Sequence, residues 1–222
     1  MIAHELEIAP GQTVTFTVTA AACSAGPPET PVGPPFVDRI AVYPTNPHAQ
    51  NPTSSPGRWA TGRPTGITVH HTGTADPLAL ARYCVSKRYY VNGAWREGLP
   101  TSQYHIFVHE DGTSELGVPL DQRGWHDHSG YPSPNASIGM ARYWHKVKPP
   151  AVMIAGLARV VAWLMREYDI PAARVEGHRD WALRVRPNPV NTECPGWYPA
   201  PVGSNWKPDF DAALTAALAE IA

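Results

Sequence analysis

The residues best suited to chemistry lie late in the chain, between Val175 and Gly196, where we expect a histidine and a cysteine on neighbouring surface loops. His178 follows a short extended stretch, and a proline-rich loop then delivers Cys194 just before a Pro-Gly turn. Imidazole nitrogen and thiolate sulfur are preferred ligands of zinc, which needs three or four donors from different segments. This stretch therefore predicts half of a metal site.

The best further donor lies well upstream, at the end of the apolar stretch 66–72, GITVHHT. Side chains alternate along a strand, so only one of His70 and His71 can face a given site. His70, His178 and Cys194 then make a set of two histidines and one cysteine, which suits zinc and leaves a fourth position for water. Because the chain has ten histidines, chance is the competing interpretation, with His178 a surface histidine and Cys194 a buried thiol.

Hydrophobic patterns predict the elements that position these residues. Period-two alternation and apolar runs predict strands over 13–19, 37–42, 66–72 and 135–143. A hairpin is expected where Asp111-Gly112 separates the β-prone runs 103–108 and 113–118. Helical spacing predicts helices from the Asp76 cap to Tyr89, over 152–168 and over 208–221.

Strands interspersed with helices, with one antiparallel hairpin, indicate an α/β fold with a mixed central sheet flanked by helices. We expect residues 1 to about 60, with short strands and proline-rich loops, to form an accessory N-terminal segment. Residues 61–222 are then the main domain, which contains all the candidate ligands. The predicted fold is thus one α/β domain with a small N-terminal β/loop extension.

The length and composition of the chain limit the classes of protein to which it can belong. The 222 residues are 43% hydrophobic and 17% charged, enough for one domain with its own core. A formal net charge of -1 gives no electrostatic reason to expect nucleic-acid or membrane binding. Three cysteines are an odd set without the spacing of a disulfide scaffold. We expect a monomer that binds neither nucleic acid nor membrane.

The N-terminal residues indicate where in the cell the chain is made. It carries His4, Glu5 and Glu7 and lacks a basic region followed by an apolar run, so it does not resemble a signal peptide. Unless a leader has been removed, we expect synthesis in the cytoplasm.

Several short motifs together resemble a known family. GITVHHTG, SQYHIFVHEDG, WHDHSG followed by NASIGM, GHRD and TECPG occur in the order seen in zinc-dependent N-acetylmuramoyl-L-alanine amidases of the type-2 family. That family includes phage-type lysozyme amidases and peptidoglycan-recognition proteins. The resemblance spans roughly residues 64–197 and leaves residues 1 to about 60 outside it.

The resemblance implies roles for individual residues. His70, the first histidine of the pair, is expected to bind Zn²⁺ together with His178 and Cys194, and Tyr104 is expected to be the catalytic hydroxyl. The alternative for Tyr104 is a half-buried structural tyrosine. The expected substrate-binding residues are His126, Asn135, Thr192 and His71. His71 can instead support a ligand or the core, and His105, which faces away from Tyr104, is predicted to be structural.

Two departures from the family pattern leave any second acid or base open. Ala141 stands where some members have a glutamate, and Thr192 replaces the lysine of phage-type lysozymes. Threonine at that position resembles the catalytically competent recognition proteins.

The chemistry implied is hydrolysis of the amide bond between N-acetylmuramic acid and L-alanine in peptidoglycan by a zinc-activated water. Tyr104 would donate a hydrogen bond to the developing oxyanion. Because Cys194 must ionise to bind, metal affinity should fall at low pH.

The leading hypothesis is a bacteriolytic endolysin of a phage or prophage, which acts on the cell wall after a holin releases it. Two alternatives stay open. One is a peptidoglycan-binding module without catalysis, and the other is an intracellular amidase that recycles muropeptides. Loss of a ligand would favour the first, and a soluble substrate in place of intact cell wall would favour the second.

Overall fold

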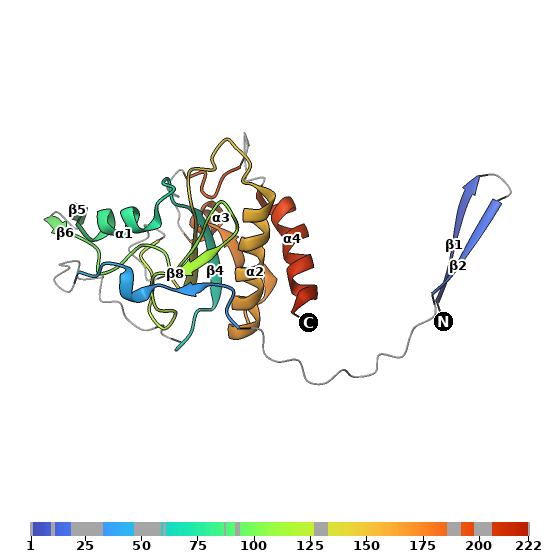
Figure 1. The fold of residues 1–222 in the computed structure, drawn as a ribbon, viewed down its shortest axis with the longest axis horizontal. Coiled ribbons are helices and arrows are strands. Elements are labelled where there is room, and N and C mark those ends of the chain that lie inside the picture. Colours follow the sequence, from blue (N-terminus) through green and yellow to red (C-terminus); the bar gives the residue numbers. More distant parts are fainter. Residues whose placement is uncertain are drawn as a thin grey trace. The chain divides into compact units, whose positions relative to one another are not determined.

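The computed structural model describes residues 2–9, 12–18, 33–46, 59, 61–86, 88–91, 94–126, 133–185, 192–197 and 206–221, with the backbone alone for 2–9, 12–18, 88–91 and 94–97. The chain forms two compact units, Met1–Gly33 and Pro34–Ala222. In the first unit, β1 (Ile2–Ala9) pairs antiparallel with β2 (Gln12–Val18) (Figure 1). The strand predicted over 13–19 is confirmed as β2, whereas β1 is a strand that the sequence analysis did not predict.

The second unit is built on a six-stranded mixed sheet in the order β10-β4-β9-β7-β8-β3. β4 pairs in parallel with β10 on one side and with β9 on the other, and β9 pairs in parallel with β7. The hairpin partner β8 runs antiparallel to β7, and β3 adds a short parallel edge. The strands are β3 (Val37–Asp38), β4 (Gly66–His71), β7 (Ile106–Val108), β8 (Ser114–Leu116), β9 (Asn135–Met140) and β10 (Val175–Gly177).

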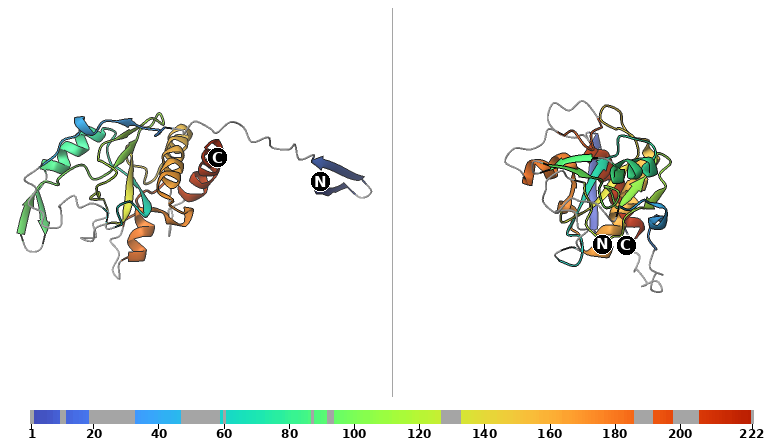
Figure 2. Two further views of the ribbon diagram at one scale, coloured as in Figure 1. Left: turned by 90° about the horizontal axis from the view of Figure 1, so that it is seen from below. Right: turned by 90° about the vertical axis from the view of Figure 1, so that its left-hand side faces the viewer.

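Helices cover both faces of this sheet. Figure 1 shows α2 and α4 side by side on one face and α1 toward the other, with the β5–β6 hairpin beyond α1, as Figure 2 also shows. The mixed sheet with flanking helices confirms the predicted α/β class. The remaining elements are α1 (Pro77–Ser86), β5 (Arg88–Val91), β6 (Ala94–Glu97), α2 (Ala151–Tyr168), α3 (His178–Val185), α4 (Trp206–Glu220) and the short 3-10 helices η1 (Ile40–Val42) and η2 (Ala172–Arg174).

The two faces of the sheet differ in chemistry. Ile67 and Val69 of β4 and Ile138 of β9 face α2 and α4, where Leu157 and Phe210 complete the main hydrophobic core. The alternate residues of the same strands face the other way and are polar, yet fully buried: Thr68, His70, Asn135 and Ser137. We call these four residues the polar layer. A buried polar group needs a hydrogen-bond partner, so the loops over this face must supply partners.

The strand predicted over 66–72 and the helices predicted over 152–168 and 208–221 hold to within two residues, whereas the strand predicted over 135–143 ends at Met140. Asp76 caps α1, since its Oδ1 accepts a hydrogen bond from the Ala79 N–H at 3.0 Å. The helix ends at Ser86 and not at Tyr89, because Tyr89 belongs to β5. The strand predicted over 37–42 ends at Asp38, whose Oδ1 accepts from the Ile40 N–H at 2.9 Å and starts η1.

Part of the predicted N-terminal segment lies in the second unit. β3 joins the main sheet through β8, and the buried Trp59 donates from Nε1 to the Leu120 carbonyl oxygen at 2.7 Å. The assignment of residues 1 to about 60 as an accessory segment stays a prediction. Among the described helices, none has both the length and the apolar character that crossing a membrane requires.

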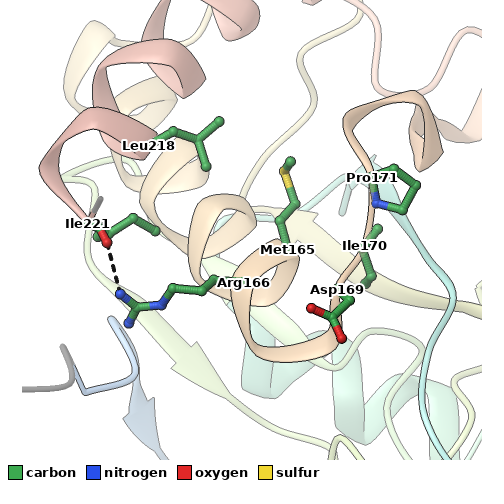
Figure 3. Close-up of a pocket in the computed structure, with 7 residues that line it drawn as sticks. All are labelled: Met165, Arg166, Asp169, Ile170, Pro171, Leu218 and Ile221. Atoms are coloured by element: carbon green, nitrogen blue, oxygen red, sulfur yellow. Dashed lines mark hydrogen bonds between the residues drawn. The ribbon is translucent and has the colours of Figure 1, made fainter.

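A pocket of about 530 Å³ opens between the C-terminal ends of α2 and α4 (Figure 3). Met165, Ile170, Leu218 and Ile221 give it an apolar lining, and Arg166 closes one side by donating to the Ile221 carbonyl oxygen at 3.1 Å. None of its lining residues is among the candidate site residues.

A close backbone contact joins α2 to the β7–β8 turn and generates a prediction. A methyl group at Gly156 would collide with the carbonyl oxygen of Gly112, whose φ of +82° marks a turn that cannot easily move. Glycine to alanine within a helix normally stabilises, by about 1 kcal/mol. We expect Gly156→Ala to lower the free energy of unfolding instead, by about 1–3 kcal/mol.

Urea unfolding measures this change, with Glu167→Ala on the exposed side of α2 as the control. Equal or higher stability of Gly156→Ala would show that the turn yields.

Candidate metal centre

Strand register brings the two candidate histidine ligands together. β10 and β4 are parallel neighbours with Gly177 beside Val69, so the next residues, His178 and His70, are also adjacent. Their ring centroids are 4.6 Å apart. His178 is the first residue of α3 and is buried, so the prediction that it stands on a surface loop is wrong. The helix starts directly at the strand end, which the Gly-His-Arg-Asp stretch did not reveal.

Cys194 completes the group from a separate loop. Its Sγ lies 3.7 Å from His70 Nδ1, and the ligand atoms of His70, His178 and Cys194 all lie within 4.8 Å of one another. Zn–N bonds of about 2.0–2.1 Å and a Zn–S bond of about 2.3 Å at a tetrahedral angle separate nitrogen from sulfur by about 3.6 Å. The donor set and its spacing therefore fit a zinc ion.

The loop around Cys194 is held by backbone hydrogen bonds. The Cys194 carbonyl oxygen accepts from the Arg179 N–H at 2.8 Å, and the Cys194 N–H donates to Thr192 Oγ1 at 3.3 Å. Pro195 packs against Gly177, where a Cβ would lie 2.7 Å from the proline Cδ. These contacts tie the cysteine loop to the start of α3, which carries His178.

Burial controls the ionisation of the cysteine. Desolvation raises the pKa of the Cys194 thiol to about 12, and the His71 backbone N–H, which donates to Sγ at 3.3 Å, opposes that shift. An incoming metal ion must therefore displace the thiol proton, as the expected loss of affinity at low pH requires.

Tyr104 lies beside the candidate ligands, just before β7. Its ring centroid is 4.9 Å from that of His70, and its side chain is buried. The ring rests on Gly139, the β9 residue paired with His70, where a Cβ would lie 2.7 Å from Tyr104 Cδ2. Glycine at this position gives the tyrosine room to approach the histidine.

His126 and Asn135 lie behind His70. His126 Nδ1 is 3.0 Å from His70 Nε2, and His126 Nε2 is 3.2 Å from the Asn135 carbonyl oxygen. The Asn135 side chain donates from Nδ2 to Thr68 Oγ1 at 2.9 Å. Only 3% of His126 and none of Asn135 is exposed.

The other two predicted substrate-binding residues, Thr192 and His71, lie beside Cys194 at the edge of the candidate metal centre. Thr192 is half-buried and accepts from the Cys194 N–H. The His71 ring is also half-buried, and its Nδ1 lies 3.0 Å from the Pro195 carbonyl oxygen, to which it donates. Desolvation lowers the pKa of His71, against the effect of that hydrogen bond. The substrate-binding roles of His126, Asn135, Thr192 and His71 stay predictions.

The sequence did not predict a cluster of polar side chains beside His71 and Cys194. The ring of Tyr143 lies 4.6 Å from that of His71, its hydroxyl lies 2.8 Å from His145 Nδ1, and His145 Nε2 contacts the Glu193 carboxylate. The signal available was the position of Glu193 directly before the candidate ligand Cys194. Ala141, where some family members have a glutamate, is buried in the main core.

His105 is structural, as predicted, and it holds the loop that leads to His126. Its Nε2 donates to the Gln122 carbonyl oxygen at 2.7 Å, and its Nδ1 accepts from the Ser137 N–H at 3.0 Å. Trp59 stacks on the ring with centroids 5.6 Å apart. The described part of this loop ends at His126, and residues 127–132, which include the rest of the WHDHSG stretch, lie outside the described residues.

Comparisons with known proteins add the family. Residues 60–197 match the model of the N-acetylmuramoyl-L-alanine amidase family. A comparison with curated protein sequences gives no match.

Two solved structures share the fold. The endolysin N-acetylmuramoyl-L-alanine amidase LysCS from Clostridium intestinale URNW has 18% identity and a TM-score of 0.54, covering 82% of this chain and 97% of that one. The Ph2119 endolysin from Thermus scotoductus MAT2119 bacteriophage Ph2119 has 16% identity and a TM-score of 0.50, covering 72% and 91%.

The buried His105 generates a pH prediction. Desolvation lowers the pKa of His105 to about 3, below the value of about 6.5 in an unfolded chain. As pH falls from 6.5 toward 3, the unfolded chain gains a proton that the folded chain does not, so stability falls by up to about 1.4 kcal/mol per pH unit. Gln in place of His105 keeps one donor and one acceptor but cannot titrate.

We therefore expect the metal-free His105→Gln protein to lose less stability between pH 6 and pH 4 than the parent. Urea unfolding with a chelator present at both pH values measures this. Equal losses in the two proteins would contradict the prediction.

Proposed function

This chain belongs to the N-acetylmuramoyl-L-alanine amidase family, and on that premise we propose that it hydrolyses the amide bond between N-acetylmuramic acid and L-alanine in peptidoglycan. The observation that carries the proposal is the meeting of His70, His178 and Cys194 within 4.8 Å, with Tyr104 against His70. Three donors leave one tetrahedral position for water or substrate, as catalytic zinc sites require.

The residues of the proposed site have two roles, metal binding and stabilisation of the transition state. His70, His178 and Cys194 would hold the ion, and one thiolate with two neutral imidazoles would leave a divalent ion with a net charge of about +1. Zinc, when bound, supplies a Lewis acid that polarises the scissile carbonyl and activates water. Tyr104 donates its hydroxyl proton in a hydrogen bond to the carbonyl oxygen as negative charge develops there.

The biological setting that we propose is lysis of the bacterial cell wall as a phage or prophage endolysin. Two solved proteins that share the fold are named endolysins, and their likeness covers most of this chain. The presence of all three ligands and the tyrosine supports an enzyme over a binding module without catalysis.

The activity is tested with the full chain and purified peptidoglycan. We expect about one zinc per chain by metal analysis and release of new L-alanine amino termini that a chelator abolishes and zinc restores. Bound zinc without release from peptidoglycan, but with cleavage of soluble muropeptides, would indicate a recycling amidase. Bound zinc with cleavage of neither substrate would indicate a binding module.

The ligand assignment predicts a loss of metal. Cys194→Ser replaces the thiolate with a hydroxyl that does not ionise at neutral pH, and His178→Ala removes a donor. Both variants should bind less than a tenth of the parent's zinc at equal concentration and lose activity, as ligand loss in a three-donor site implies. Cys84→Ser, at the chain's other described buried cysteine, is the matched control and should keep its zinc. Full zinc content in Cys194→Ser would remove Cys194 from the set.

The role assigned to Tyr104 predicts slower turnover without loss of zinc. Tyr104→Phe should keep its zinc but turn over about 10²–10³-fold more slowly, the usual effect of losing one oxyanion donor. Gly139→Ala, which displaces the ring on steric grounds, should slow turnover in the same direction. Tyr168→Phe on α2 serves as the control, and unchanged turnover in Tyr104→Phe would assign that residue a packing role.

A further inference from the structure

His126 occupies an unusual place for a residue expected to touch substrate. Its ring lies between His70 and the backbone of Asn135, 3.0 Å from His70 Nε2 and 3.2 Å from the Asn135 carbonyl oxygen. Only 3% of the residue is exposed. Both ring nitrogens thus lie within hydrogen-bond distance of protein atoms, and a substrate has little of the ring to contact.

The direction of these hydrogen bonds follows from donor and acceptor chemistry. A carbonyl oxygen only accepts, so His126 Nε2 must carry the hydrogen that it donates to Asn135. In a neutral imidazole the other nitrogen then accepts, so His126 Nδ1 accepts from the Nε2–H of His70. His70 is left with its lone pair on Nδ1.

That nitrogen is the one that faces the candidate metal site. His70 Nδ1 lies 3.7 Å from Cys194 Sγ, close to the separation of about 3.6 Å across a tetrahedral zinc ion. In the opposite tautomer His70 would point an N–H at the sulfur, and the ligand set would lose one donor. The hydrogen bond from His70 to His126 therefore selects both the tautomer and the ring orientation that a metal ion needs.

We propose that His126 is a positioning residue, which holds His70 in the tautomer that binds metal through Nδ1. The proposal rests on the proposed metal centre and deepens it. It gives His126 a different role from the substrate contact that the family resemblance implies.

The surroundings of His126 fit this role, because three contacts hold the loop that carries it. Trp59 Nε1 donates to the Leu120 carbonyl oxygen and His105 Nε2 donates to that of Gln122, each at 2.7 Å. Gly124 lies against the His105 ring, where a Cβ would be 2.8 Å from Cε1. On the other side of His126, Asn135 is held by the hydrogen bond from its side chain to Thr68 Oγ1. The acceptor for His70 is thus held in place from both sides.

The test compares the full-length parent with His126→Ala and His126→Gln. Alanine removes the acceptor, whereas the glutamine amide can accept from His70 through its oxygen and donate to Asn135 through its nitrogen. We expect zinc affinity, measured by competition with a chelating dye, to fall about 10–100-fold in His126→Ala. It should stay within about threefold of the parent in His126→Gln, since both hydrogen bonds are kept.

Ser133→Ala is the matched control for local damage. Ser133 is buried and accepts from the Asn135 N–H at 3.2 Å, but it makes no hydrogen bond to His70 in the described structure. Its loss should leave zinc affinity unchanged.

A spectroscopic measurement reads the tautomer directly. In the parent labelled with ¹⁵N-histidine and loaded with ¹¹³Cd²⁺, metal coupling should appear on Nδ1 of His70. This measurement needs no variant, so coupling on Nε2 would overturn the proposal even if His126→Ala does not fold.

Coupling on Nε2 of His70, or parent-like zinc affinity in His126→Ala, would overturn the proposal. If His126→Ala keeps its zinc and loses only affinity for peptidoglycan, His126 contacts substrate. A parent chain that binds no zinc would instead defeat the metal centre itself, so the two failures can be told apart.

Discussion

β4 pairs in parallel with β10 on one side and β9 on the other, and this shared register determines which side chains meet at the metal centre. It places His178 beside His70 at one edge of β4 and Gly139 beside His70 at the other, where Tyr104 uses the space that glycine leaves. A slip of one residue in β4 would turn His70 into the hydrophobic core and bring Val69 to the site. The core packing of Val69 and Ile67 under α2 therefore also orients the ligand.

The polar layer places a second demand on the fold. Thr68, His70, Asn135 and Ser137 are fully buried, and burying polar groups without partners costs several kcal/mol in total. The structure meets most of this demand with the loop that leads to His126 and with His105, which bonds to Ser137. Hydrogen bonds of this kind fix side chains in position in advance, which suits the catalysis that we propose.

The site also combines burial with ionisation. Burial raises the pKa of the Cys194 thiol and so favours the neutral form until a metal ion displaces the proton. The same low-dielectric surroundings strengthen the hydrogen bonds around His70, and they would strengthen the hydrogen bond that we propose Tyr104 donates to a developing oxyanion. The metal binding and the catalysis that we propose would thus both depend on one feature, the burial of the polar face of the sheet.

The sequence by itself determined the strands and helices whose patterns are local. The apolar run ending in His70, the Asp111-Gly112 turn and the spacing along α2 each depend on residues a few positions apart, and each appears in the structure as expected. The residue types of the proposed ligands also stood out in the sequence, because thiolate and imidazole have specific metal chemistry. Only the tertiary structure decided the partners that lie far apart in sequence. The bond of His126 to His70 and the anchoring of the loop by Trp59 depend on which ring nitrogen meets which acceptor once the chain has compacted. No periodic pattern in the sequence predicts such a hydrogen bond, since hydrogen-bond direction and burial are properties of the packed chain.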